Sequence, residues 1–356
     1  LSLAYSLTGG LKAVAMTDIV QVILLIFGGL AVSFIALNKI SEGQGVLEGM
    51  SIVYTSMPEK FDMILSADNP SYKNLPGIWI LLGAGVWIGH FSCWGFSQYI
   101  TQRALGAKSI KEAQKGVMFA AYLKLLMPIV IVLPGICAAI LFPVLEKSDQ
   151  AYPSMMSLLP NGLLGLTFAA LIAAIVSSLA SMTNSISTIF TMDIYRSFAR
   201  QDPSQARLIS IGRASVVVSL LVAVFVAKPL LGSVSSIFQF IQEFTGFFTP
   251  GIFVIFLVAL FWKKATSLSV LVAAILSLVT TSLFYYFVPD IAYIHRMGVV
   301  FFISGFGCYL TTLMQGFADQ EKAINLNNID FKTSRSFNIN TLIVSCVLLL
   351  IYGIFY

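Results

Sequence analysis

The sequence carries little charge. Of its 356 residues only 10% are charged and 58% are hydrophobic, whereas about 25% of residues are charged in a typical soluble domain. With a mean hydropathy of +0.89, a water-soluble globular protein is excluded. The net charge of +5 comes from scattered residues, so a disordered chain and a nucleic-acid-binding protein are excluded as well. We expect a multi-pass protein of the inner or plasma membrane, embedded in the lipid bilayer.

Cysteine and histidine are scarce. There are only two histidines, His90 and His295, they lie in different apolar stretches, and the sequence contains no HExxH, GxSxG or phosphate-loop motif. We therefore expect neither an enzyme nor a bound cofactor. The cysteines lie in apolar stretches without CxxC spacing, which indicates isolated thiols rather than disulfides or a metal site. They are Cys93, Cys137, Cys308 and Cys346.

Long apolar runs dominate what remains. A bilayer core needs about 20 mostly apolar residues per helix, and runs of this length exclude a porin-type barrel. We expect an all-α transmembrane protein with nine spans. These are about 11–38, 77–102, 116–143, 162–188, 209–228, 233–262, 266–288, 297–317 and 338–356. The start LSLAYSLTGG lacks Met and a signal-peptide layout, and the end falls in an apolar run. We expect the C-terminal portion of a longer protein.

The lysines and arginines divide unequally between alternate loops. Basic residues concentrate on the cytoplasmic side of membrane proteins. Fourteen are on one side, which we assign to the cytoplasm: Lys12, Arg103, Lys108, Lys111, Lys115, Arg196, Arg200, Arg207, Arg213, Lys263, Lys264, Lys322, Lys332 and Arg335. Six are on the outside: Lys39, Lys60, Lys73, Lys147, Lys228 and Arg296.

Several regions depart from plain apolar helices. The outer segment 39–76 is long and polar, and we expect short helices that serve as a lid or only as a connector. Pro128 and Pro134 interrupt the span 116–143, and TGFFTPG predicts a break around Pro250. Breaks of this kind line cavities in transporters, but prolines are also common in ordinary membrane helices.

Lys124 lies within an apolar run, nine residues beyond the loop residue Lys115. That separation is about 13 Å along a helix. Such a lysine either donates hydrogen bonds to a bound solute or extends to the interface.

The stretch AAIVSSLASMTNSIST contains two adjacent serines. Ala174, Ser177 and Ser178 fall at i, i+3 and i+4, on one helix face. Hydroxyl and carbonyl oxygens there suit an alkali cation, but faces of small residues also allow membrane helices to pack closely. Asp18 lies near the cytoplasmic end of the first span. It could shelter a departing cation, or it could be an interfacial cap or a salt-bridge partner, and the sequence favours the cap.

Two further segments combine aromatic and polar groups. IQEFTGFFTPG carries Gln242 and Glu243, and GHFSCWGFSQY carries His90, Cys93 and Trp94. Glutamine donates and accepts hydrogen bonds, and an aromatic face stacks on a sugar ring. An ordinary aromatic-rich helix explains the second segment equally well.

These stretches together resemble the sodium:solute symporter family, and within it most closely the bacterial sodium/galactose (sodium/glucose) cotransporters. The resemblance weakens after about residue 290. It rests on TGGLKAVAMTDIVQ (8–21), NPSYKNLPGIWILLGAGVW (69–87), AKSIKEAQKGVMFAAYLKLLMPIVIVLPGI (107–136), LIAAIVSSLASMTNSISTIFTMDIY (171–195), FQFIQEFTGFFTPGI (238–252) and LFWKKATS (260–267).

The resemblance implies a leucine-transporter-like fold with two inverted repeats. The chain, a single transmembrane domain over 1–356, would then hold the last helix of the first repeat in 1–38, the second repeat in 77–262, and three accessory helices in 263–356. It also implies sodium binding by the Ala174 carbonyl and the Ser177 and Ser178 hydroxyls.

By the same resemblance, Lys124 and Gln242 contact the sugar and Asp18 lies on the sodium release path. Two positions depart from the galactose transporter: Cys93, next to Trp94, replaces a gate tyrosine, and His90 replaces an asparagine. The implied function is sodium-coupled sugar import by alternating access, with sodium as the co-transported ion. The alternatives are sodium symport of another solute, such as proline, pantothenate or sialic acid, and a transporter-like solute sensor.

Overall fold

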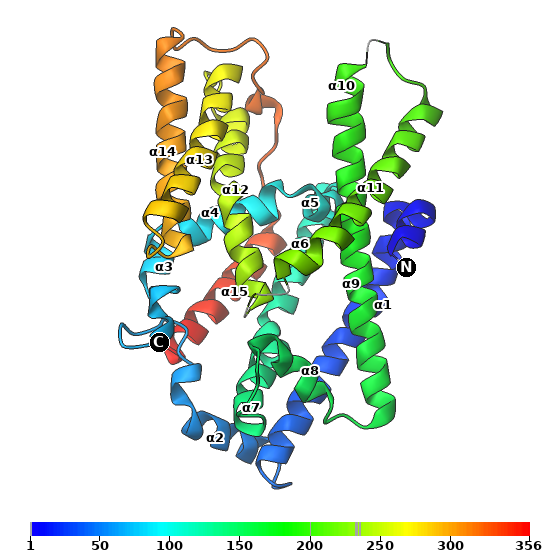
Figure 1. The fold of residues 1–356 in the computed structure, drawn as a ribbon, viewed down its shortest axis with the longest axis vertical. Coiled ribbons are helices and arrows are strands. Elements are labelled where there is room, and N and C mark those ends of the chain that lie inside the picture. Colours follow the sequence, from blue (N-terminus) through cyan, green and yellow to red (C-terminus); the bar gives the residue numbers. More distant parts are fainter. Residues whose placement is uncertain (1, 200, 232–233, 235) are drawn as a thin grey trace. The chain divides into compact units, whose positions relative to one another are not determined.

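The computed structural model describes residues 2–199, 201–231, 234 and 236–356, with the side chains of all but 2–14, 231 and 328. The described residues form helices and connecting loops, without a strand. They divide into two compact units (Figure 1). Unit 1 comprises 1–61 and 119–237, and unit 2 comprises 62–118 and 238–356.

Unit 1 is built on α1 (Ser2–Ile40) and α9 (Asn161–Thr188), which pack along each other. Small residues permit the close approach: a Cβ atom added at Gly28 of α1 would lie 2.7 Å from the Thr167 side chain of α9. The π-helical stretch η6 (Ile189–Tyr195) and α10 (Arg196–Phe198) extend α9. α11 (Gln205–Leu231) packs against α9 as well.

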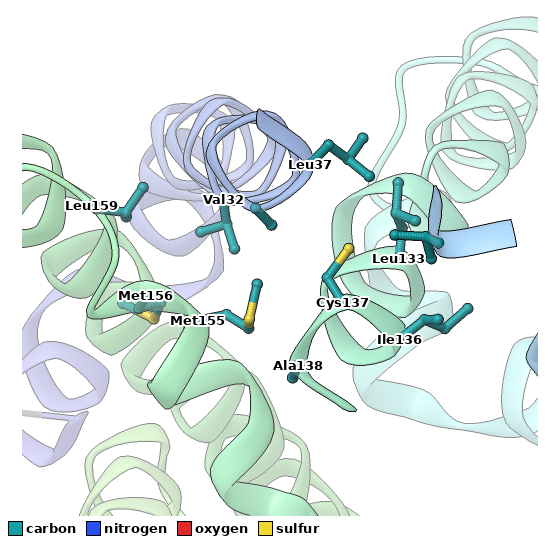
Figure 2. Packing of buried hydrophobic residues seen from close by; sticks show 11 residues of the cluster. Val32, Leu37, Leu133, Ile136, Cys137, Ala138, Met155, Met156 and Leu159 are labelled. Atoms are coloured by element: carbon teal, nitrogen blue, oxygen red, sulfur yellow. The ribbon is translucent and has the colours of Figure 1, made fainter. Parts of the chain in front are cut away.

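An apolar core closes one end of unit 1. It joins α1 to α2 (Val46–Ser56), α7 (Leu133–Leu141) and α8 (Ala151–Met156). Figure 2 shows Val32, Cys137 and Met155 gathered between the helices that carry them.

The segment 39–76 contains short helices, as expected. They are α2 and the 3₁₀ turns η1 (Pro58–Lys60) and η2 (Pro70–Lys73). A further turn, η5 (Ser148–Gln150), precedes α8.

Unit 2 contains four long helices, of which α13 and α14 pack along each other. Phe253, Val254 and Met297 are among its buried residues. The 3₁₀ turn η7 (Leu326–Asn328) precedes the last helix. The long helices are α12 (Ile237–Phe261), α13 (Ser267–Phe287), α14 (Tyr293–Met314) and α15 (Arg335–Ile354).

Eight helices among the described residues are long and apolar enough to cross a membrane. The expected ninth span, 77–102, is wrong as a continuous helix. It is divided into α3 (Trp79–Leu82), α4 (Gly85–Phe91), the π-helical η3 (Ser92–Phe96) and α5 (Gln98–Leu105). The chain leaves helical geometry at Ala84, where φ is +64°, and at Ser97, which is extended.

Close packing explains the first of these breaks. A Cβ atom at Gly85 would lie 1.8 Å from the backbone oxygen of Ile294 in α14, and one at Gly298 would lie 2.4 Å from the backbone oxygen of Gly83. The segment thus turns where glycines allow its backbone to touch α14.

The break predicted around Pro250 is also wrong, because α12 runs through it without interruption. Pro250 is fully buried, and a Cβ atom at Gly251 would lie 2.8 Å from the Ser277 side chain of α13. Tight packing against a neighbour retains the helix although proline removes one hydrogen bond.

At Pro128 the helix does change. α6 (Ile110–Leu125) is followed by the π-helical η4 (Pro128–Val132) and then by α7. The widened turn exposes the Ile129 carbonyl, which accepts a hydrogen bond from Ser33 Oγ of α1 at 2.5 Å. The irregularity predicted for 116–143 is thus confirmed, and a neighbouring helix satisfies the backbone there.

Candidate functional site

The serine pair of α9 lies in unit 1. Ser177 is 3% exposed, Ala174 is half-buried, and Ser178 is exposed. Small side chains such as Ala170, Ala180 and Ser181 cover the buried face of α9, and α1 packs along this helix. Ser177 therefore lies within the packed surface of α9, while the side chain of Ser178 is exposed.

Asp18 meets Ser177. The Ser177 hydroxyl donates a hydrogen bond to the Asp18 carboxylate, across 159 positions of sequence. Ser181 Oγ donates in turn to the Ser177 backbone oxygen at 3.1 Å. Asp18 lies inside α1 rather than at its end, so it does not cap this helix.

The oxygen atoms at this place suit a singly charged cation. Asp18 supplies a carboxylate and Ser177 a hydroxyl, and helical spacing places Ala174 and Ser178 on the same face of α9 as Ser177. Among the described side chains, no three His, Cys, Asp or Glu residues gather as a transition metal or Ca²⁺ would require. The chemistry available here is thus that of hard, mostly neutral oxygen ligands.

Lys124 also belongs to unit 1, at the C-terminal end of α6. Its side chain is exposed. The apolar span that contains it runs from Ile110 to Leu141, so Lys124 is about 21 Å along the helix from the first residue. An ordinary interfacial lysine lies much nearer to an end of its apolar span.

Gln242 lies on α12 in unit 2, and its side chain is exposed. It is within hydrogen-bonding reach of the phenol of Tyr293, the first residue of α14. The neighbouring Glu243 accepts a hydrogen bond from Gln239 Nε2 at 2.9 Å. Sequence reasoning missed Tyr293, because nothing in the apolar pattern of α14 links it to α12.

His90, Cys93 and Trp94 lie on the broken segment of unit 2. His90 ends α4, and the other two belong to the π-helical turn η3. His90 and Trp94 are exposed, and Cys93 is half-buried beside the Tyr99 phenol, within hydrogen-bonding reach. π-Helical turns recur at functional sites. The glycines around this stretch were the sequence feature that could have indicated an irregular helix here.

The predicted residues thus fall into separate groups. Unit 1 brings Asp18 to Ser177 and holds Lys124, while unit 2 holds Gln242, His90 and the two residues that follow on η3. A cavity of about 720 Å³ in unit 1, between α9, η6 and α11, is lined by none of them. Arg196 lines this cavity and pairs with Asp202 at 2.8 Å, which is an exposed ion pair.

Comparison with known proteins gives consistent results. The family model described as "Sodium:solute symporter family" matches residues 1–279. The sodium/glucose cotransporter of Vibrio parahaemolyticus is 41% identical over 374 aligned positions, which cover 100% of this chain and 68% of that protein. The human sodium/myo-inositol cotransporter 2 is 32% identical over 288 positions, covering 73% of this chain and 42% of that protein.

One solved structure also matches. It is a substrate-bound, outward-open sodium-coupled sialic acid symporter, with a TM-score of 0.73 and 22% identity. The match covers 89% of this chain and 65% of that one. At this identity the likeness shows the fold alone, which is the expected leucine-transporter-like fold.

Eight apolar helices and these matches agree on a multi-pass protein of the plasma membrane. The relatives are transporters, which confirms that the protein is not an enzyme. The expected family is also confirmed: the chain belongs to the sodium:solute symporter family.

Proposed function

We propose that the protein is a sodium-coupled symporter that imports a sugar such as galactose or glucose by alternating access. The single observation that carries this proposal is the hydrogen bond from Ser177 to Asp18. It joins a carboxylate to the serine pair of α9 in a chain that is 41% identical to a sodium/glucose cotransporter.

Sodium is bound by the Ala174 carbonyl and the Ser177 and Ser178 hydroxyls. The exposed Ser178 offers its oxygen directly, and Ser177 offers the lone pairs left when its proton points to Asp18. Asp18 then receives the ion on its way to the cytoplasm. The hydrogen bond between Ser177 and Asp18 supports this order, because it places the carboxylate one contact away from the ligand oxygen.

The sugar is held by donors and acceptors from several helices. Lys124 and Gln242 hydrogen-bond its hydroxyls, and Trp94 stacks on its apolar face. His90 and Cys93 complete the contacts. The place of Lys124 near the middle of the apolar span 110–141 supports a ligand role, since a charge at that depth is costly unless it serves a site.

The chain divides into the repeats expected of this fold. Residues 1–38 supply the last helix of the first inverted repeat, 77–262 the second repeat, and 263–356 the accessory helices. The broken segment 79–105 supports this division, because transporters of this type place a discontinuous helix at the substrate.

A second candidate keeps sodium and changes the solute. Two relatives are named for myo-inositol and sialic acid. The departures at His90 and Cys93 are also compatible with another small solute. A competition panel with galactose, glucose, myo-inositol, sialic acid, proline and pantothenate separates them. Inhibition by proline and by none of the sugars would exclude the sugar.

The test is uptake of labelled galactose and glucose by proteoliposomes that contain the full-length protein. We expect uptake with an inward sodium gradient, block by unlabelled sugar, and no uptake when potassium replaces sodium. If active protein shows no sodium-driven uptake of any solute in the panel, symport is wrong and a solute sensor becomes the better account.

A further inference from the structure

Unit 2 contains a cavity between the start of α14, the end of α13 and the loop after η2. Its volume is about 300 Å³, at the lower end of the range of about 300–1,000 Å³ typical of small-ligand pockets. We call it the α14 cavity. Its polar and aromatic lining includes Asn74, Glu243, Tyr285, Tyr293 and Arg296.

Arg296 is the most unusual of these residues. It is only 9% exposed. Among the described residues, its guanidinium has no ion pair or hydrogen bond. It makes a cation–π contact with the Tyr285 ring, whose centre lies 5.7 Å from Cζ. A buried arginine has five donors to satisfy. Its position on the cavity wall leaves these donors available to a molecule inside.

The charges around the α14 cavity balance. Lys73 and Asp290 line its rim and pair with each other at 2.6 Å, and this contact holds the pKa of the Asp290 carboxyl below its ordinary value. Glu243 faces the same cavity as Arg296 without an ion pair among the described residues. A net charge on the ligand is therefore not favoured, whereas a ligand with both donors and acceptors satisfies both side chains.

Two phenol rings supply flat apolar surface. Tyr285 is 52% exposed and Tyr293 is half-buried, and both line the cavity. Aromatic faces beside charged and amide groups form the combination that holds a polyhydroxylated ring. Tyr293 also lies within hydrogen-bonding reach of Gln242, so the cavity adjoins a residue that we assign to the transported sugar.

We propose that the α14 cavity is a second binding site for the neutral polyhydroxylated solute, independent of sodium. Arg296 donates to its hydroxyls, Glu243 accepts from them, and Tyr285 packs on its ring. The proposal rests on the proposed function for the identity of the solute. It adds a site with residues of its own, none of which is a proposed sodium ligand.

The test is protection from thiol labelling. Asn74→Cys is introduced into the full-length protein, and a membrane-impermeant thiosulfonate reagent is applied in potassium buffer without sodium. Peptide mass spectrometry then measures labelling at position 74 separately from the native cysteines. Lys60→Cys, at an exposed position of η1 in unit 1, serves as the matched control.

We expect galactose to slow labelling at position 74 at least threefold and to leave position 60 unchanged. Gln242→Ala should retain the protection. Arg296→Gln and, as a milder change, Glu243→Gln should each raise the half-protecting concentration about tenfold or more. Expression at the level of the parent protein and an unchanged Tm identify the preparations of Arg296→Gln and Glu243→Gln in which the protein is folded.

Three results would overturn the site. They are no protection without sodium, protection that disappears in Gln242→Ala, and equal protection by potassium acetate, which would assign the cavity to anions. Uptake measured on the same preparations separates the two proposals. If sugar uptake proceeds without protection, only the second site is wrong, and if no sugar is transported, the proposed function is wrong.

Discussion

Ser177 can serve two partners at once. Its hydroxyl donates to Asp18, and this orients the proton toward α1 and leaves two lone pairs on the oxygen. A cation can use those lone pairs without breaking the hydrogen bond. The contact with Asp18 therefore orients Ser177 as a ligand. Ser178 beside it is exposed, so its hydroxyl can bind a cation without disturbing the packing of α9.

Replacing Ser178 tests the sodium site at its accessible ligand. We expect Ser178→Ala to raise the half-activating sodium concentration about tenfold and to leave expression unchanged. One lost ligand of roughly 1–1.5 kcal/mol corresponds to that factor. The measurement is the sodium dependence of sugar uptake.

Ser185→Ala is the matched control, since Ser185 lies on the same helix and is buried away from the serine pair. It should leave the sodium dependence unchanged. If Ser178→Ala behaves like this control, the serine face of α9 serves only for helix packing.

Lys124 gives a prediction for the solute. Lys124→Met keeps most of the length of the side chain and removes its donors, so the KM for the sugar should rise about tenfold or more. The half-activating sodium concentration should change less. Initial rates of uptake over a range of sugar concentrations provide both values.

Lys115→Met controls for the loss of a charge from α6. Lys115 pairs with Glu112 at 2.8 Å on an exposed turn, so its removal should leave the KM unchanged. A sugar KM that is the same in Lys124→Met and in the parent protein would assign Lys124 to the membrane interface.

Residue patterns predicted only part of these sites. The i, i+3, i+4 spacing identified the serine face of α9, because helical periodicity is local. The partnership of Ser177 with Asp18 could not be derived, because it joins positions 159 residues apart. Arg296 was counted as an outer loop charge, and only the packing of α14 shows that it is buried.

At the scale of elements, local composition predicted the helices well where contact with lipid determines the residue pattern. It was misleading where packing against neighbouring helices determines whether a helix breaks. Long apolar runs predicted the spans of α1, α9 and α12. Proline suggested a break in α12 that its packing on α13 prevents. Glycine permitted a real break before α4, where the backbone touches α14. Which helix packs against the proline of α12 or the glycines before α4 could not be derived from the sequence.

Gly85 tests this account of the broken segment. In Gly85→Ala, the new Cβ atom would meet the Ile294 backbone oxygen at 1.8 Å. Backbone cannot yield as a flexible side chain does, so we expect a loss of roughly 1–3 kcal/mol or more in stability. Thermal unfolding of the purified protein measures the change as a lower Tm.

Gly95→Ala provides the comparison within the same segment, because a Cβ atom at Gly95 has no atom within 4 Å. Its Tm should stay within a degree or two of the parent protein. Equal stability of Gly85→Ala and Gly95→Ala would mean that the contact of α4 with α14 does not determine where the helix breaks.

At the scale of the whole molecule, symport requires that sodium and solute bias the same conformational equilibrium. A ligand shifts such an equilibrium only by its difference in affinity for the two states. The proposed sodium ligands all lie in unit 1, whereas most proposed solute ligands lie in unit 2. Coupling is therefore a property of the complete protein.

The most direct measurement of that coupling is accumulation driven by voltage alone. Proteoliposomes with the full-length protein, equal sodium on both sides and a potassium diffusion potential of about −100 mV receive labelled sugar. One sodium per sugar then supplies about 2.3 kcal/mol, which corresponds to about 50-fold accumulation. We predict a ratio that approaches this value and returns to one when the potential is collapsed. A ratio that stays at one despite exchange of labelled sugar, or accumulation without sodium, would contradict sodium-coupled symport.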